Sequence, residues 1–152
     1  MARKRKSNTT TWLIVAGLIA AGFLWLKHQL SLIQIGSPSI PFQKLDGTTV
    51  ILGIKLPIIN PGAIAARVTG FAGYILNPEG TVISTVYLTR PASIPRFQQT
   101  ELDFTTYIRA TDALTELYGI LSKGGKVNWK GYKIKGQLLI YGIPIPVESA
   151  IL

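Results

Sequence analysis

The most hydrophobic stretch of the chain lies near its N-terminus, where residues 12–26 carry no charged or strongly polar side chain. A helix packed on a soluble core shows a polar face every 3.6 residues, and this stretch shows none. Its fifteen residues would span about 22 Å as a helix, against a hydrocarbon core of about 30 Å. The preceding threonines and an outward-reaching Lys27 close most of that gap. The pattern predicts a single transmembrane helix over residues 9–30.

The side chains of this helix and the charges beside it predict its placement in a lipid bilayer. Trp12 and Trp25 fall near the two membrane interfaces, which amphipathic rings favour, and Leu18 and Phe23 fall between them. Four basic residues precede the helix and Lys27 follows it, so the positive-inside bias puts the N-terminus in the cytoplasm and the remaining chain on the opposite side. The four basic residues before the helix are Arg3, Lys4, Arg5 and Lys6, and we expect them to contact anionic lipid headgroups.

A cleaved signal peptide is the competing interpretation, because a basic segment before a short apolar run fits that pattern too. Small residues occur at positions 20–22, but cleavage there would leave an apolar stub at residues 23–26. We therefore expect the helix to be retained.

Beyond residue 30, apolar and polar positions alternate, which is typical of half-buried strands. The clearest strand covers residues 48–60, with Pro57 suggesting a sheet edge or bulge near its end. Its inward side chains are Val50, Leu52, Ile54, Leu56 and Ile58. Further strands are expected within 39–45 and at 63–76, 81–89, 100–109, 126–129 and 132–141.

Two of these strands, 63–76 and 81–89, are joined by a four-residue turn and are predicted to be antiparallel neighbours. Gly70 and Gly73 suggest a bulge in the first of them. Alternate residues of this strand are expected to face inward: Ile64, Ala66, Val68, Ala72, Tyr74 and Leu76. In residues 100–109 the inward positions are Leu102, Phe104, Thr106 and Ile108.

One short helix is expected within this β-rich part, at residues 112–121. Thr111 and Asp112 are candidate caps, and Gly124 and Gly125 follow the last apolar position. The apolar stripe consists of Leu114, Leu117, Tyr118 and Leu121. The final extended segment, 142–147, carries two prolines and therefore belongs at a sheet edge.

These elements predict an all-β fold of the fibronectin III or immunoglobulin type: a sandwich with one short helix, preceded by a single transmembrane helix. The domain organisation that follows is a basic tail at 1–8 and the transmembrane helix at 9–30. A connector with a first short strand covers 31–47, and the sandwich covers 48–152.

The chemistry that the sequence offers is sparse. Cysteine is absent and His28 is the single histidine, so no thiol site, serine triad or histidine metal site is expected, and no cofactor. Glu101 and Asp103 share one face of a strand, where we expect ion pairs with Arg96 or Arg109 rather than acid–base catalysis.

A cluster of lysines near the C-terminus is the one feature with a binding chemistry. The cluster contains Lys123, Lys126, Lys130, Lys133 and Lys135, has no acidic residue among them, and is interleaved with Trp129 and Tyr132. One interpretation is a solvated edge that resists aggregation. The other is a contact for an anionic surface such as lipid headgroups, in which Lys126, Lys130, Lys133 and Lys135 take part. Much of the net charge of +9 comes from the N-terminal tail, so nucleic acid is not expected as a partner except through that tail.

The order of motifs from residue 49 onward resembles the late embryogenesis abundant group 2 family, also called the WHy (water stress and hypersensitive response) domain. The motifs are a strand closing on Asn60-Pro61, a turn at 77–80, Ile94-Pro95 before a Thr-led strand, a helix at 112–121, Tyr132-x-Ile134-x-Gly136, and a closing Ile-Pro-Ile-Pro-Val segment at 143–147. The resemblance implies a fibronectin-like sandwich with one helix, no catalytic centre, a role in stress or desiccation protection, and single-span membrane attachment in several members.

The function that the sequence favours is therefore a non-enzymatic, membrane-anchored binding or structural module. The alternative is a structural membrane protein of a lipid-containing virion or another membrane assembly, with protein partners there and the N-terminus in the particle interior. An enzyme is the least favoured class.

Overall fold

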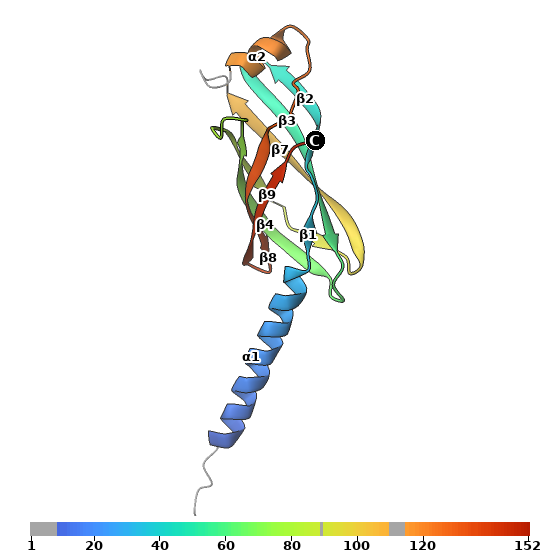
Figure 1. Cartoon of the computed structure of the whole chain (residues 1–152), viewed down its shortest axis with the longest axis vertical. Helices are drawn as coiled ribbons and strands as arrows, with labels where there is room; N and C mark the ends of the chain where they lie inside the picture. The colour runs from blue at the N-terminus through green and yellow to red at the C-terminus, as the bar shows by residue number, and fades with distance from the viewer. Residues whose placement is uncertain (1–8, 89, 110–114) are drawn as a thin grey trace, which may run out of the picture.

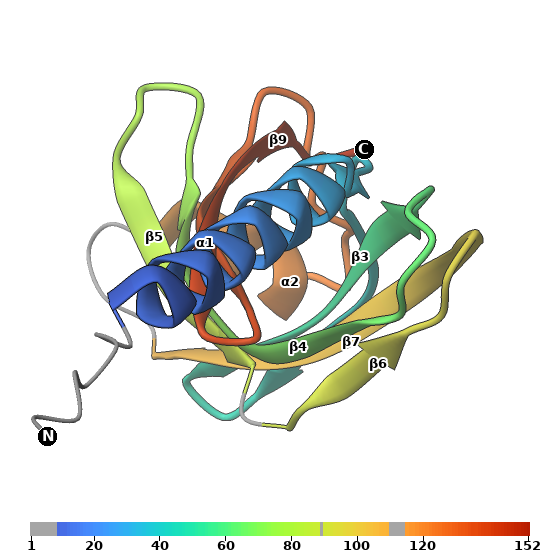
Figure 2. The same ribbon diagram turned by 90° about the horizontal axis from the view of Figure 1, so that it is seen from below.

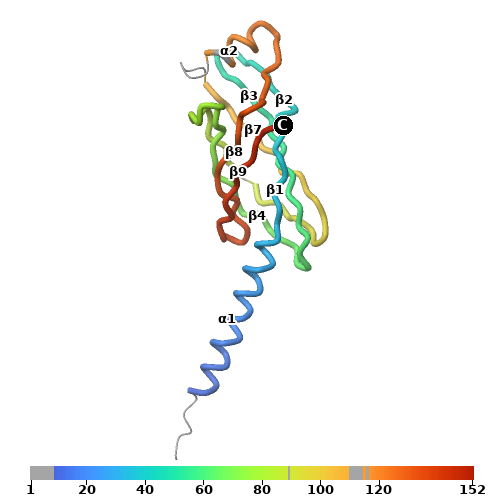
Figure 3. The backbone as a smooth tube through the Cα atoms, in the orientation of Figure 1, coloured from blue at the N-terminus to red at the C-terminus, as the bar shows by residue number. Residues whose placement is uncertain are grey.

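The computed structural model of the chain describes residues 9–88, 90–109 and 115–152. A long helix, α1 (Thr9–Ser31), projects from one end of a two-sheet β-sandwich, and the short α2 (Thr115–Ser122) lies at the opposite end (Figure 1, Figure 3). The structure confirms the prediction of an all-β sandwich that contains one short helix and is preceded by an N-terminal helix.

The first sheet is built around β3 (Thr49–Asn60). Along one edge, β7 (Gln98–Arg109) pairs with β3 over its whole length, from Thr49 opposite Arg109 to Asn60 opposite Gln98. Along the other edge, β1 (Gln34–Ile35) and β2 (Ser39–Asp46) pair with β3 one after the other. Residues 31–47, expected as a connector with a first strand, thus supply two strands of this sheet.

The second sheet has the order β5-β4-β8-β9, and all of its pairs are antiparallel. Its strands are β4 (Ala66–Leu76), β5 (Val82–Leu88), β8 (Lys133–Ile140) and β9 (Ile143–Ala150), and β6 (Ala92–Ile94) pairs with the start of β4. The predicted hairpin between β4 and β5 is confirmed. The proline-bearing β9 lies at a sheet edge, as expected.

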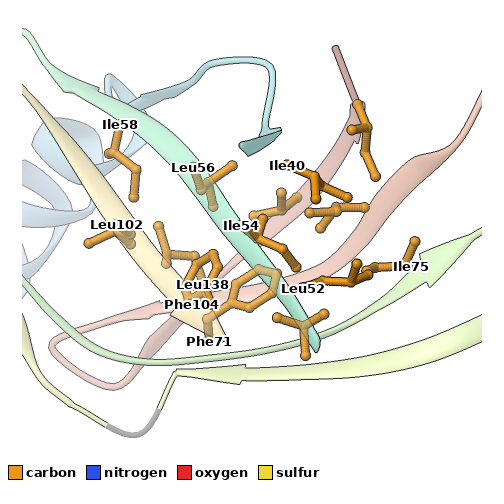
Figure 4. Packing of buried hydrophobic residues seen from close by; sticks show 14 of the residues in the cluster. Ile40, Leu52, Ile54, Leu56, Ile58, Phe71, Ile75, Leu102, Phe104 and Leu138 are labelled. Atoms are coloured by element: carbon orange, nitrogen blue, oxygen red, sulfur yellow. The ribbon is translucent and has the colours of Figure 1, made fainter. Parts of the chain in front are cut away.

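The core lies between the inner faces of the two sheets, as Figure 4 shows for part of the cluster. Every second residue of β3 from Val50 to Ile58 is at most 1% exposed. The predicted inward face of β7 is also confirmed, since Leu102, Phe104, Thr106 and Ile108 are all buried. Phe71 of β4 stacks on Phe104 of β7 with ring centroids 5.3 Å apart, which joins the two sheets.

A bulge in β4 reverses the side-chain pattern that simple alternation predicts. The register with β8 shifts between Val68 and Gly70, where the sequence suggested a bulge. Ala66 and Val68 face the core as expected, but beyond the shift Phe71 and Ile75 are buried, while Ala72 and Tyr74 are exposed. The predicted inward face is therefore wrong for Ala72 and Tyr74, because one extra residue turns the following side chains to the other side.

Residues 126–129 do not form the predicted strand. Side chains accept two backbone N–H groups in and just after this segment: Val127 N–H donates to Gln43 Oε1 at 3.3 Å, and Lys130 N–H donates to Asn128 Oδ1 at 3.0 Å. An Asx-type turn of this kind competes with strand pairing. Val127 and Trp129 nevertheless point into the core.

Pro57 predicts a sheet edge or a bulge, but its strand is paired along both edges, so the sheet edge is wrong. It occupies the place where β1 ends and β2 has not yet begun, and its carbonyl accepts the Gly36 N–H at 2.8 Å. The missing N–H of proline therefore faces the interruption between the two short strands, where no ladder bond is lost.

Helix α2 ends as its glycines predict. Gly124 has a φ of 72°, Gly124 N–H donates to Leu121 O, and Gly125 N–H donates to Ile120 O, which is a Schellman motif. Leu117 is buried, whereas the predicted caps Thr111 and Asp112, and Leu114, lie outside the described residues.

A buried asparagine organises the end of the sandwich next to α1. Asn60, 1% exposed, is the last residue of β3. Its Nδ2 donates toward the carbonyls of Ile64, Ile94 and Pro95 at 2.8, 3.3 and 3.3 Å, and its Oδ1 accepts the Gly62 N–H at 3.1 Å. One side chain thus holds the β3–β4 loop and the end of β6 in place.

Replacing Asn60 with alanine should lower the free energy of unfolding by about 3 kcal/mol, since each buried polar group left without a partner costs about 1–3 kcal/mol. The matched control is Asn128→Ala, because Asn128 is exposed and bonds only locally. We expect it to change stability by less than about 0.5 kcal/mol. Denaturant unfolding followed by circular dichroism measures both variants, and equal losses would contradict the role given to Asn60.

Candidate functional site

Helix α1 presents apolar side chains all round. Each residue from Thr9 to Trp25 is exposed, and the side chains predicted to anchor the chain are 71% (Trp12), 68% (Leu18), 56% (Phe23) and 53% (Trp25) exposed. With 23 residues, α1 extends about 34 Å at 1.5 Å per residue, and its exposed part from Thr9 to Trp25 supplies about 25 Å toward a hydrocarbon core of about 30 Å. Within the described chain it is the one helix long and apolar enough to cross a membrane.

The last turn of α1 is built into the sandwich. Leu30 is 3% exposed and Leu26 packs against the core. The Gln29 side-chain carbonyl accepts the Ala63 N–H from the β3–β4 loop at 3.2 Å. Three residues after the helix ends, Gln34 pairs with Ile59 of β3. The helix therefore leaves the sandwich directly, with no intervening linker.

The four lysines proposed as an anionic-surface contact are not gathered on one face. Lys133 and Lys135 lie on the outer face of β8, whereas Lys126 borders a hollow beside β2 and Lys130 lies in the turn after Asn128. Arg3, Lys4, Arg5 and Lys6 lie outside the described residues.

The fold also brings a carboxylate to the lysines of β8. Glu148 of β9 lies 3.8 Å from Lys133 and 3.9 Å from Lys135, measured between side-chain nitrogen and oxygen. All three side chains are more than half exposed, so the contacts are weak, but they halve the net charge of this group.

The aromatic residues interleaved with the lysines are not available for stacking on a ligand in the way the sequence suggested. Trp129 is 5% exposed and belongs to the core. Tyr132 is half-buried and meets Trp129 edge-on at 5.1 Å. Their place in the sequence beside the lysines reflects packing in and against the core, because the segment 126–129 is not an exposed strand.

A different pair of aromatic residues borders a shallow hollow on the second sheet. The hollow has a volume of about 400 Å³ and is lined by Ala72, Gly73, Tyr74, Tyr87, Lys135, Gly136 and Gln137. Tyr74 and Tyr87 are 48% and 60% exposed. Two phenol rings, an ammonium and an amide around a small concavity can stack on and hydrogen-bond a polar ligand.

Two glycines that line this hollow have no room for a side chain, because neighbouring backbone atoms lie too close. Gly73 and Gly136 face each other across β4 and β8. A Cβ on Gly73 would lie 2.7 Å from Lys135 O, so a larger residue there would push the strands apart. Sequence reasoning missed this hollow because alternation placed Tyr74 inward. The signal that could have revealed it is the bulge at Gly70.

The acidic residues of β7 pair differently from expectation. Glu101 accepts a hydrogen bond from Lys55 of the neighbouring β3 at 3.1 Å, rather than pairing with Arg96 or Arg109. This hydrogen bond and the charge of Glu101, followed by that of Asp103, raise the pKa of Lys55 above its ordinary value. The group is a solvent-exposed cross-strand pair.

No cluster of three or more metal-ligating side chains occurs among the residues that the structure describes. His28 is exposed on the last turn of α1, and its carbonyl accepts a hydrogen bond from Ser31.

Comparison with known proteins gives the chain no family. No family model and no curated protein matches it. Among solved structures, a protein from Archaeoglobus fulgidus is similar over 76% of this chain and 94% of its own, at 13% identity and a TM-score of 0.49.

Two glycosidases are also similar, over small parts of their own length. An exo-chitosanase from Amycolatopsis orientalis matches 77% of this chain and 12% of its own, at 16% identity and a TM-score of 0.47. A β-glucuronidase of glycoside hydrolase family 2 matches 74% of this chain and 10% of its own, at 14% identity and a TM-score of 0.44. Likeness at this level assigns no activity.

If the lysines of β8 contact anionic membranes, Glu148 should oppose that binding. In fragment 29–152, Glu148→Gln should strengthen sedimentation with phosphatidylglycerol vesicles about fivefold, and Lys133→Gln with Lys135→Gln should weaken it, since each charge near the surface contributes about 1 kcal/mol. Neutral vesicles are the control. Unchanged binding in both variants would show that these lysines only solvate the outer face of β8, which is not the expected sheet edge because β8 is paired with both β4 and β9.

Proposed function

We propose that this chain is a non-enzymatic, single-span membrane protein in which α1 anchors the sandwich directly at the membrane surface. The observation that carries the proposal is the contrast within α1: its first seventeen residues, Thr9 to Trp25, are exposed, while Leu30 is buried in the sandwich. One end of the helix packs on the sandwich, whereas the apolar side chains from Trp12 to Trp25 are exposed.

The large apolar side chains of α1 gain free energy when they are removed from water. Burial is worth about 25 cal/mol per Å² of apolar surface, or about 1.5–3 kcal/mol for each large side chain. Soluble proteins rarely expose a continuous apolar surface of this extent. A bilayer buries it all round, and the regular helix satisfies its own backbone groups there.

The basic tail supports an orientation with the N-terminus in the cytoplasm and the sandwich on the other side. The sandwich would then serve as a binding or structural module, with the Tyr74–Tyr87 hollow on its outer face as a candidate contact.

Placing arginine at Leu18 and Phe23 should release the protein from membranes, because a charge near the bilayer centre, where Leu18 would lie, costs about 2.5–3.5 kcal/mol and the charge at residue 23 adds a smaller cost. The control is Leu18→Ala with Phe23→Leu, which keeps the helix apolar. Extraction with alkaline carbonate measures retention, and protease added to intact spheroplasts should digest the sandwich while sparing α1. Retention of the arginine variant would refute the anchor, and full protection would refute the orientation.

The resemblance to the late embryogenesis abundant group 2 family supports a protective role under water stress. Cells that lack the protein should then survive drying less well, and the full chain should restore survival. The arginine variant should not, because protection at the membrane needs the anchor. Equal survival without the protein would contradict this role, and co-purification with a lipid-containing particle would favour the structural alternative.

A further inference from the structure

The spacing between the apolar part of α1 and the sandwich is too short to hold the sandwich clear of a membrane. The apolar run ends at Leu26 and Leu30 is already in the core, so about 6 Å of helix separates them. The polar layer of a bilayer occupies about 5–8 Å on each side. Given the proposed anchor, on which this inference rests, the near end of the sandwich meets the headgroups.

Three segments form that near end, and we call them the α1-end loops: residues 61–65, 95–97 and 141–142. The strand register places them, since Gln34 pairs with Ile59 just after α1, and Asn60 pairs with Gln98. Tyr141 Oη donates to Ala65 O at 2.8 Å, which ties the third segment to the first. Figure 2 looks onto this end of the sandwich from below, with α1 in front.

Exposed aromatic residues occur on two of the α1-end loops. Phe97 is 67% exposed and Tyr141 is 49% exposed. Both have the positive φ that side chains rarely adopt, 55° and 50°, and no other non-glycine residue does so in the described chain. A left-handed backbone at an exposed aromatic residue is a local strain that the turns maintain.

The charge of this end is uniformly positive. Arg96 lies beside Phe97, Arg67 follows the first loop, and Lys27 lies at the end of the apolar run, while residues 61–67, 95–97 and 141–142 contain no aspartate or glutamate. The turns at the other end carry Asp46 and Glu79. Aromatic rings with arginine and lysine are the composition that favours the membrane interface.

An apolar hollow lies at the same level, between the end of α1 and β9. It has a volume of about 300 Å³, and its lining includes Lys27, Leu30, Ile143 and Pro144. An apolar concavity with an ammonium at its edge fits the glycerol region and phosphate of a lipid.

We infer that the α1-end loops are a second membrane contact, which docks on the headgroup layer around the anchor. Phe97 and Tyr141 insert their rings at the interface, and Arg96, Arg67 and Lys27 bind the phosphates of anionic lipids. With the helix fixed to the core and the loops fixed to the headgroups, the sandwich keeps one tilt on the membrane.

The absence of cysteine allows a direct test on the full chain in vesicles of phosphatidylcholine and phosphatidylglycerol. Single cysteines replace Ala63, Phe97, Tyr107 or Leu18 and carry an environment-sensitive fluorophore. Lipids with a nitroxide on the headgroup or deep in the acyl chain quench it. Tyr107 is the matched control, because its side chain is 68% exposed and that of Phe97 is 67% exposed. It lies ten residues further along the chain, which is about 33 Å along the extended strand β7.

Headgroup nitroxides should quench labels at residues 63 and 97 and leave residue 107 unquenched. Adding Arg96→Glu should reduce quenching at residue 63 about twofold, while Arg109→Glu, at the far end of β7, should not. Equal quenching at 63, 97 and 107, or none at 63 and 97, would overturn the docking inference while deep quenching at residue 18 still upholds the anchor. Absence of deep quenching at residue 18 would refute the anchor and the docking together.

Discussion

The inner face of β3 is the constraint on which the rest of the sandwich depends. Its alternate side chains from Val50 to Ile58 are almost fully buried, and both of its edges are hydrogen-bonded, to β7 along one side and to β1 and β2 along the other. A one-residue slip would turn every one of these side chains to solvent, so the register of three neighbouring strands is fixed together. The second sheet then closes over this face, with Phe71 stacked on Phe104.

The same strand organises the end of the sandwich next to α1. Asn60 closes β3 and holds the following loop and the end of β6, and the loop in turn contacts Gln29 of α1. A polar side chain in the interior is stable when its hydrogen-bonding groups are satisfied, and here that satisfaction joins the helix to both sheets. The last turn of the apolar helix is therefore fixed to the core, and the loops around it form a defined surface.

The ion pairs found among the described residues are exposed at the surface of the sandwich. The pairs Lys55–Glu101 and Lys135–Glu148 are exposed and contribute little to stability. They matter more for how charge is distributed over the surface. Glu148 lowers the net positive charge around the β8 lysines. The α1-end loops contain no carboxylate that would do the same for Arg96, Arg67 and Lys27. The proposed membrane attachment follows from this asymmetry together with the apolar helix.

The sequence by itself determined the long apolar helix, the strands around Leu52 and Phe104, the turn at 77–80 and the glycine end of α2. These features depend on local periodicity and turn chemistry, which neighbouring residues specify. Only the tertiary structure decided that Tyr74 faces outward, that Trp129 is buried, that Glu148 meets Lys133 and Lys135, and that Asn60 ties three segments together. Each of these depends on a bulge that shifts the alternation or on a partner far away in the chain, and neither is encoded in the spacing of nearby residues.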